Sequence, residues 1–288
     1  MRLIISLVTI FVTTAAYSAD ITVMSPFGPS GSSHQTTQFV ADAIATVGHK
    51  TEAKSFNNCA LARTNWDSSE KAVMLRDPVF NSVPLINCRI PTTTENIIIV
   101  ANRSPLFFCN NGPNGKTMED FLKPGSRHSV GDSMNAPTAQ IFKRIDSDVK
   151  NHTRAIPFDY NTQTAAAAKS GEIDFIIASG LWPEQQLGAK CFWHTGDVTV
   201  EGYKRAIDIW PNNKMLQATY SFWFIAKGFN TKEMADLRKT ISDQWSTNKD
   251  WIELRKKRGW EDRMVPTDLK IAVQQIETEY KIWTDPNF

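Results

Sequence analysis

Short apolar runs that are each followed by a turn and a helical pattern recur along this chain of 288 residues. The first run, 21–24, suits a buried strand, and apolar residues then recur at helical spacing across 39–47. The same order returns at 127–130 with a helical pattern over 137–145, and a third unit places a helix before a strand within 165–177. Strands that alternate with helices predict an α/β fold with mainly parallel sheets.

The region after residue 229 is helical in pattern. Apolar residues share one helix face between 237 and 245 and again between 269 and 283, and Asn230 with Glu233 resembles a capping pair. We therefore expect the chain to close with helices that pack against the α/β units.

Residues 1–19 differ from the rest of the chain. A basic start at Arg2, an apolar run from Leu3 to Val12 and a small-residue ending at Ala19 are typical of an export signal that is cleaved after Ala19. A short membrane anchor is the alternative, but the run is shorter than the roughly 20 residues that span a bilayer. We expect a mature protein that is exported and soluble.

The charge balance argues against nucleic acid as a partner. The formal net charge of +2 falls to +1 when Arg2 leaves with the leader, and a nucleic-acid-binding chain would carry a clear basic excess. The basic runs 232–238 and 255–258 are interpreted as solvated helix faces.

The four cysteines are Cys59, Cys88, Cys109 and Cys191, and no two of them form a CxxC pair. A zinc or iron–sulfur site is therefore not expected, and no histidine stands in a metal-spaced pair. In an oxidising compartment two disulfides can form in three pairings, of which we prefer Cys59 with Cys88; buried thiols are the alternative.

The segment "PFGPSGSSHQT" joins the first strand to its helix. The N–H groups of a helix start have no partner within the helix, and the helix dipole favours negative charge there. Gly28 and Gly31 let the main chain approach a ligand, while Ser30, Ser32 and Ser33 add hydroxyl donors. The loop either binds an anion or is a plain capped turn.

A second donor-rich turn, "GDSMNAPT", starts at Gly131 after the strand at 127–130. Two such turns at the carboxyl ends of strands are what a ligand site in an open α/β sheet requires. Four aromatic residues each follow an expected strand and are expected to line this site: Phe27, Phe158, Tyr160 and Trp182. For Trp182 a core or surface position is the alternative.

Known catalytic motifs are missing from these loops. "GPSGSS" is neither a G-x-S-x-G elbow nor a phosphate-binding P-loop. Asp132 suits a general base in principle, although a carboxylate in a turn more often caps its own backbone. The alternative to binding is a secreted serine-dependent enzyme that uses Ser33 or Ser133 with a nearby histidine, or a ligand sensor on the same scaffold.

Five segments in order resemble the substrate-binding receptors of tripartite tricarboxylate transporters, the Bug family. "ITVMSPFGPSGSSHQTTQFVADAI" is similar to the family's first strand, loop and helix, and "HSVGDSMNAPTAQIF" to its second loop. "AIPFDYNTQTAAAAKSGEIDFIIAS" resembles its next unit, and the segments that begin at Lys227 and Val265 resemble its closing helices. His34 stands near the position of the family's loop aspartate.

The resemblance implies a two-lobed, type II periplasmic binding protein that is not an enzyme, needs no cofactor and is a monomer. It implies that lobe one comprises 20–122 and 229–288, and lobe two 123–228. It further implies that a small organic carboxylate is bound between the lobes and delivered to the membrane subunits of a tripartite transporter. The ligand-binding residues would be Phe27, Gly28, Ser30, Gly31, Ser32, Ser33, Gly131, Asp132, Ser133, Asn135, Ala136, Thr138, Phe158 and Asp159.

Overall fold

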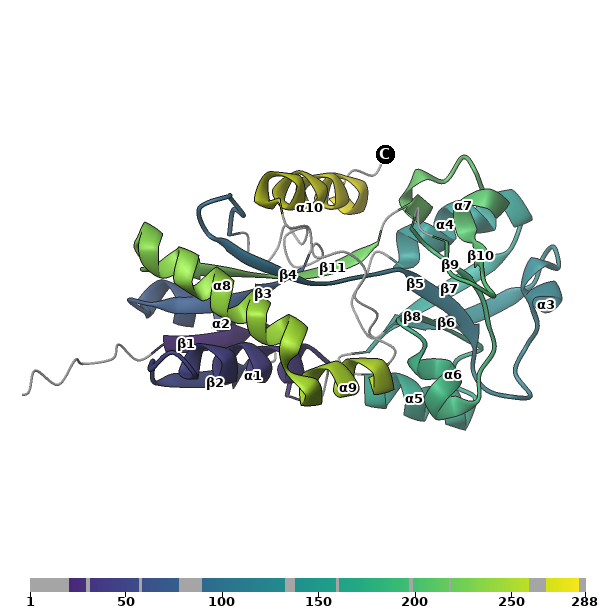
Figure 1. The fold of residues 1–288 in the computed structure, drawn as a ribbon. Coiled ribbons are helices and arrows are strands. Elements are labelled where there is room, and N and C mark those ends of the chain that lie inside the picture. The colour runs from purple at the N-terminus through teal and green to yellow at the C-terminus, as the bar shows by residue number, and fades with distance from the viewer. Residues whose placement is uncertain are drawn as a thin grey trace, which may run out of the picture.

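The structure is a computed structural model that describes residues 21–29, 32–56, 59–77, 90–132, 138–158, 161–196, 199–217, 219–258 and 268–284. These residues form two α/β lobes, each built on its own sheet (Figure 1). The leader predicted at residues 1–19 lies outside this part of the chain.

The first sheet has the strand order β2-β1-β3-β11-β4. Strands β2, β1 and β3 are parallel, while β11 runs antiparallel to both of its neighbours. The strands are β1 (Ile21–Ser25), β2 (Thr51–Ser55), β3 (Ala72–Arg76), β4 (Ile97–Ser104) and β11 (Tyr220–Lys227), and the helices of this lobe are α1 (Ser32–Ala45), α2 (Cys59–Ser68), α8 (Thr231–Thr247), α9 (Lys249–Arg258) and α10 (Leu269–Thr284).

The second sheet has the strand order β10-β9-β5-β8-β6-β7. Strands β8, β6 and β7 are parallel, and β5 is antiparallel to β8 and β9. The strands are β5 (Leu106–Asn110), β6 (Arg127–Asp132), β7 (His152–Pro157), β8 (Phe175–Ser179), β9 (Cys191–His194) and β10 (Lys204–Arg205), and the helices are α3 (Met118–Leu122), α4 (Thr138–Val149), α5 (Asn161–Ser170), α6 (Trp182–Leu187), α7 (Ala206–Ile209) and the 3₁₀ helix η1 (Lys214–Gln217).

The chain passes between the sheets twice. Strand β4 ends in the first sheet at Ser104, and β5 begins in the second sheet at Leu106, with only Pro105 between them. The chain returns after η1, because Tyr220 already pairs with Ser104 in the first sheet. Strand β11 enters from the other lobe and runs against β3 and β4, which makes the first sheet mixed, as β5 does in the second sheet. The predicted lobe limits at residues 122 and 229 stay a prediction; strand pairing alone divides the chain earlier at both places.

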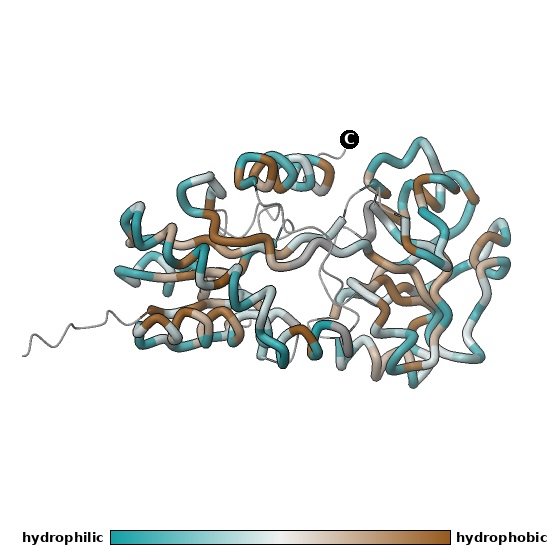
Figure 2. The backbone as a smooth tube through the Cα atoms, viewed as in Figure 1, coloured by the Kyte–Doolittle hydropathy of each residue, from teal (hydrophilic) through white to brown (hydrophobic). Residues whose placement is uncertain are grey.

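Apolar residues bury both faces of each sheet. In the first lobe, α1, α8 and α9 cover one face through Ile44, Ile241 and Trp251, and α2 and α10 cover the other through Trp66 and Ile276. The largest cluster of the second lobe gathers aromatic rings around Phe108. In Figure 2 the central strands are accordingly brown and much of the outer helices teal.

Local sequence signals predicted most of these helices correctly. Apolar spacing indicated α1, α4, α5 and α10, and the predicted capping pair is present, since the Asn230 side chain accepts from the N–H of Glu233 while the Glu233 side chain accepts from the N–H of Asn230. One interpretation was wrong. Arg255, placed on a solvated face, is buried, donates to the Trp245 carbonyl at 2.9 Å and lies over the Trp245 ring.

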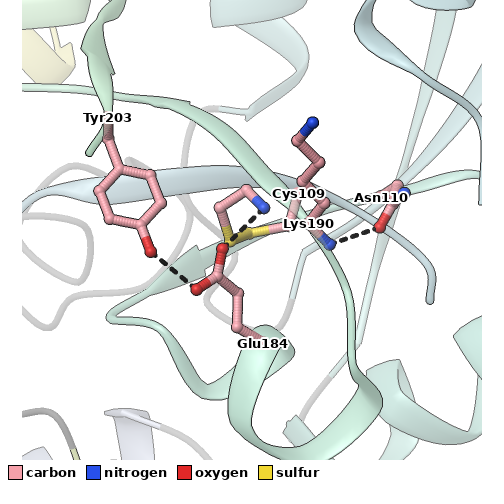
Figure 3. Close-up of a disulfide and its surroundings, with 6 residues drawn as sticks. Cys109, Asn110, Glu184, Lys190 and Tyr203 are labelled. Carbon is pink, nitrogen blue, oxygen red and sulfur yellow. Dashed lines mark hydrogen bonds between the residues drawn. A yellow bond between two sulfur atoms is a disulfide. The ribbon is translucent and has the colours of Figure 1, made fainter. Parts of the chain in front are cut away.

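A disulfide joins Cys109 of β5 to Cys191 of β9, which are partners in neighbouring strands (Figure 3). Glu184 of α6 lies beside this bond: its carboxylate accepts from the Cys191 N–H at 2.9 Å and from the Tyr203 hydroxyl at 2.7 Å. Burial and this contact raise the pKa of Tyr203 to about 12.

The remaining cysteine in the described part of the chain, Cys59, is also disulfide-bonded. The preferred partner, Cys88, lies outside the described residues. The alternative of buried thiols is therefore wrong for Cys59, Cys109 and Cys191.

None of the helices within the described ranges is long and apolar enough to cross a bilayer.

Candidate functional site

The first predicted loop begins where β1 ends. Ser25 is fully buried, and its hydroxyl accepts from the N–H of Phe27 at 3.2 Å, which turns the chain out of the strand. Ser33 is buried in the first turn of α1, and its carbonyl accepts from the Thr37 hydroxyl at 2.8 Å. Phe27, Gly28 and Ser33 are therefore placed at the end of β1. Ser30, Gly31 and the side chain of Ser32 lie outside the described residues.

His34 lies in the same first turn of α1. Its Nδ1 is 2.8 Å from the hydroxyl of Ser55, the last residue of β2, and Ser55 pairs with Ser25 across the sheet. The helix start is thereby tied to the carboxyl ends of two parallel strands. Sequence reasoning singled out His34, but it gave no reason to expect Ser55 beside it.

Two adjacent residues of opposite charge, which sequence reasoning did not single out, are buried at the end of the next strand. Arg76 ends β3 and Asp77 follows it, and both are fully buried. Burial lowers the pKa of Arg76 to about 10, and the neighbouring charge of Asp77 opposes this shift. Met24 pairs with Met74, so Arg76 and Asp77 lie beside the segment that leaves β1. The sequence feature that could have indicated these residues is the pair of opposite charges directly after the apolar run 72–75.

Tyr220 connects this pair to the second lobe. It is the first residue of β11 and is fully buried. Burial raises the pKa of its hydroxyl well above 10, and the nearby carboxylates of Asp77 and Asp132 raise it further. Asp77 follows β3 of the first sheet and Asp132 ends β6 of the second. Carboxylates at the ends of strands from both sheets therefore influence one tyrosine hydroxyl.

An aromatic path joins the first loop to the same tyrosine. The rings of Phe27 and Phe222 meet edge to face with centroids 5.7 Å apart, and those of Phe222 and Tyr220 with centroids 5.0 Å apart. Phe222 packs against core clusters of both lobes. The structure thus brings Phe27 and Asp132, two of the predicted site residues, to opposite sides of one buried junction.

The second predicted loop starts later than expected. Gly131 and Asp132 are the last residues of β6 and pair with both β7 and β8, so their placement in a loop was wrong. A Cβ atom on Gly131 would stand 2.4 Å from Cδ1 of Ile173 and 3.3 Å from the Phe158 ring. Close packing inside the sheet is enough to require a glycine here, and the predicted role of Gly131 in ligand binding stays a prediction.

Phe158 follows β7, and its N–H donates to the carbonyl of Asp132 at 2.7 Å. Its ring packs against the small cluster beside α5, together with Trp182, which is buried there as a core residue. Thr138 is the first residue of α4, but its side chain lies outside the described part, as do Ser133, Asn135, Ala136, Asp159 and Tyr160.

Two serine–histidine contacts bear on the enzyme alternative. They join His34 to Ser55 at 2.8 Å and His128 to Ser126 at 2.7 Å. Neither involves Ser33, and within the described ranges neither imidazole is hydrogen-bonded to a carboxylate that could orient it as a base. No group of three or more potential metal ligands was found in those ranges either.

The two sheets and their crossing strand define the fold of a two-lobed periplasmic binding protein, and the comparisons agree. No protein-family description matches the sequence, and no curated protein is similar to it in sequence. Solved structures do match. One described as a periplasmic transporter superposes with a TM-score of 0.71 at 16% identity, covering 94% of this chain and 97% of that one.

The Bug-type receptors have the same fold. The periplasmic binding protein BugD matches with a TM-score of 0.70 at 12% identity, over 92% of this chain and 95% of BugD. MatC from Rhodopseudomonas palustris with bound malate matches with a TM-score of 0.67 at 13% identity, over 94% of this chain and 99% of MatC. The fold implied by the sequence resemblance is thereby confirmed, as is the two-lobed α/β class.

Proposed function

We propose that this protein is an extracytoplasmic solute-binding protein that captures a small organic carboxylate between its lobes. It then delivers the carboxylate to the membrane subunits of a tripartite tricarboxylate-type transporter. The observation that carries the proposal is the meeting of strand ends from both sheets around Tyr220, next to the first predicted loop. A ligand held by the two loops that follow these strands would contact both lobes at once, as a receptor that closes on its ligand requires.

The chemistry of the first loop supports a carboxylate. The start of α1 supplies N–H groups without helical partners, and the segment that leads into it is rich in serine and glycine. The second loop leads into α4 in the same way. The fold shared with a malate-bound receptor is consistent with this class of ligand.

The export signal predicted at 1–19 supports a periplasmic location, and disulfide bonding supports an oxidising compartment. The lobe limits at 122 and 229 and the monomeric state remain part of the proposal. So do the ligand contacts of Ser30, Gly31, Ser32, Ser133, Asn135, Ala136, Thr138 and Asp159.

Thermal unfolding of the purified mature protein tests the proposal against a panel of dicarboxylates, aromatic acids and amino acids. A ligand at about 100 times its Kd adds about 2.7 kcal/mol of stability. This corresponds to a rise in Tm of roughly 5–10 °C for a chain of this size. The proposal is overturned if no compound of the panel raises the Tm and mass spectrometry after denaturation detects no co-purified acid.

Gly31→Glu tests the first loop directly. A bulky carboxylate there should repel an anionic ligand and block the approach of the main chain, so binding is lost while the fold remains. Val47→Glu is the matched control, because Val47 is exposed near the other end of α1 and receives the same charge. Unchanged affinity in Gly31→Glu would remove this loop from the site.

The enzyme alternative has one observation in its favour, the contact of His34 with Ser55. Hydrolysis of activated esters by the wild-type protein, abolished in Ser55→Ala, would support it. Binding without turnover is the expected result, because no carboxylate orients the His34 imidazole within the described ranges. A sensor would bind the same ligands and is distinguished by its protein partner.

A further inference from the structure

Helix α10 (Leu269–Thr284) packs into the cores of both lobes. Its first half places Ala272 and Ile276 in the cluster between α10 and the first sheet, where Trp223 of β11 also lies. Its last turns place Ile282 in the main cluster of the second lobe, which contains Phe108 of β5. The helix accordingly contacts both β4 and η1, and it lies above β4 and β11 in Figure 1.

A buried hydrogen bond lies between these two anchors. The carboxylate of Glu279, whose residue is only 3% exposed, accepts from the hydroxyl of Thr219, which is 1% exposed. Thr219 immediately precedes Tyr220, the first residue of β11, so this bond attaches α10 to the segment that returns from the second lobe to the first. Removal of either partner would deprive the other of this bond in a buried position, which is costly.

The geometry of a helix turns these contacts into a mechanical constraint. Six residues separate Ile276 from Ile282, which fixes the two anchors about 9 Å apart along a rigid helix at 1.5 Å per residue. If the lobes rotate apart about the connections at Pro105 and Thr219, α10 cannot follow both cores. One of its anchors must leave its apolar cluster.

We propose that α10 restrains the two lobes in the arrangement seen here, and that release of Ile282 and of the Glu279–Thr219 bond accompanies their separation. Ile282, Glu279 and Thr219 are positioning residues in this account, and none of them needs to touch a ligand. The proposal therefore concerns how the lobes move and does not depend on the identity of the ligand.

Small-angle X-ray scattering of the unliganded protein tests the restraint. Thr219→Val removes the donor with little change of shape, and Ile282→Ala removes the anchor in the second lobe. Each should increase the radius of gyration and shift the ratio of open to closed molecules by about tenfold, the effect of losing one buried hydrogen bond or one apolar anchor. Lys281→Ala is the matched control, because Lys281 is exposed on the same turns of α10.

The double variant of Thr219 and Glu279 adds a specific readout. Glu279→Gln keeps an acceptor for the Thr219 hydroxyl, so it should increase the radius of gyration less than Thr219→Val does. Because Thr219→Val already removes the bond, the double variant with Glu279→Gln should scatter much like Thr219→Val alone. A folded Thr219→Val and a folded Ile282→Ala that both scatter like the wild type would overturn the proposal. So would equal opening by Lys281→Ala. Because no ligand is present, failure here is separate from failure of the carboxylate-binding proposal.

Discussion

Gly131 offers the sharpest test of how the second lobe is packed. In Gly131→Ala, the new Cβ would lie 2.4 Å from Cδ1 of Ile173 and 3.1 Å from Cγ2 of Thr164. The first distance is far below van der Waals contact, so Ile173 must shift or β6 must move. Overpacking of this kind costs about 1–3 kcal/mol of unfolding free energy.

A second substitution tests whether the clash with Ile173 causes this loss of stability. Ile173→Val removes the Cδ1 atom that clashes, at a cost of about 0.5–1.5 kcal/mol when made alone. In the double variant the alanine methyl occupies the space vacated by Cδ1, so the combined cost should stay near that of Ile173→Val alone. The coupling energy between the two positions should then be about 1 kcal/mol or more in favour of the double variant.

Urea unfolding of the four proteins in this cycle measures the coupling. Gly112→Ala is the control, because its Cβ would meet only the Leu187 carbonyl, at an ordinary 3.8 Å, and its unfolding free energy should change by no more than about 0.5 kcal/mol. Strict additivity of Gly131→Ala and Ile173→Val would refute the packing argument. If Gly131→Ala leaves the free energy of unfolding unchanged but abolishes ligand binding, Gly131 acts directly in the binding site.

Three further measurements address other parts of the fold. Burial, together with the positive charge of Lys116, lowers the pKa of His128. As the pH falls below about 6.5, the unfolded chain therefore binds a proton at this residue before the folded chain does, and the free energy of unfolding should decrease. In thermal melts, His128→Gln should reduce this dependence of Tm on pH. Arg255→Leu should cost about 1–3 kcal/mol by chemical denaturation, since it removes a buried donor and a cation over an indole ring, and a neutral result would restore the solvated-face interpretation. Reduction of the Cys109–Cys191 bond, which closes a sequence separation of 82 residues, should lower the unfolding free energy by about 4 kcal/mol, and a Tm insensitive to reductant would contradict this.

Local signals account for what the sequence predicted. Helical spacing of apolar residues, a capping pair at Asn230 and a turn glycine at Gly171 all act within a few residues of one another, and each was found at its expected place. The strand that ends at Ser25 and the loop that follows it belong to the same category. Such features need no knowledge of distant contacts.

The remaining features depend on contacts between distant segments. Tyr220 is affected by Asp77 and Asp132 only because the ends of β3 and β6, from different sheets, lie near the start of β11. Gly131 was assigned to a loop because a glycine followed by Asp132 suits a turn, whereas the space left by Ile173 decides its place inside the sheet. Arg255 stands in a charged run, and its burial follows from the way α9 folds back onto Trp245 of α8.

The charges at the junction restrict how a carboxylate can be held there. Asp77 and Asp132 both lie near Tyr220, and the single buried cation among these groups, Arg76, is adjacent to Asp77. A third anion beside Tyr220 would meet two like charges in a buried setting, where repulsion is strong. For the carboxylate of the proposed function, the favourable positions are therefore the starts of α1 and α4, where backbone N–H groups without helical partners can offset a negative charge. Under that proposal the junction would hold the two helix starts in register, and the loops that lead into them would bind the ligand.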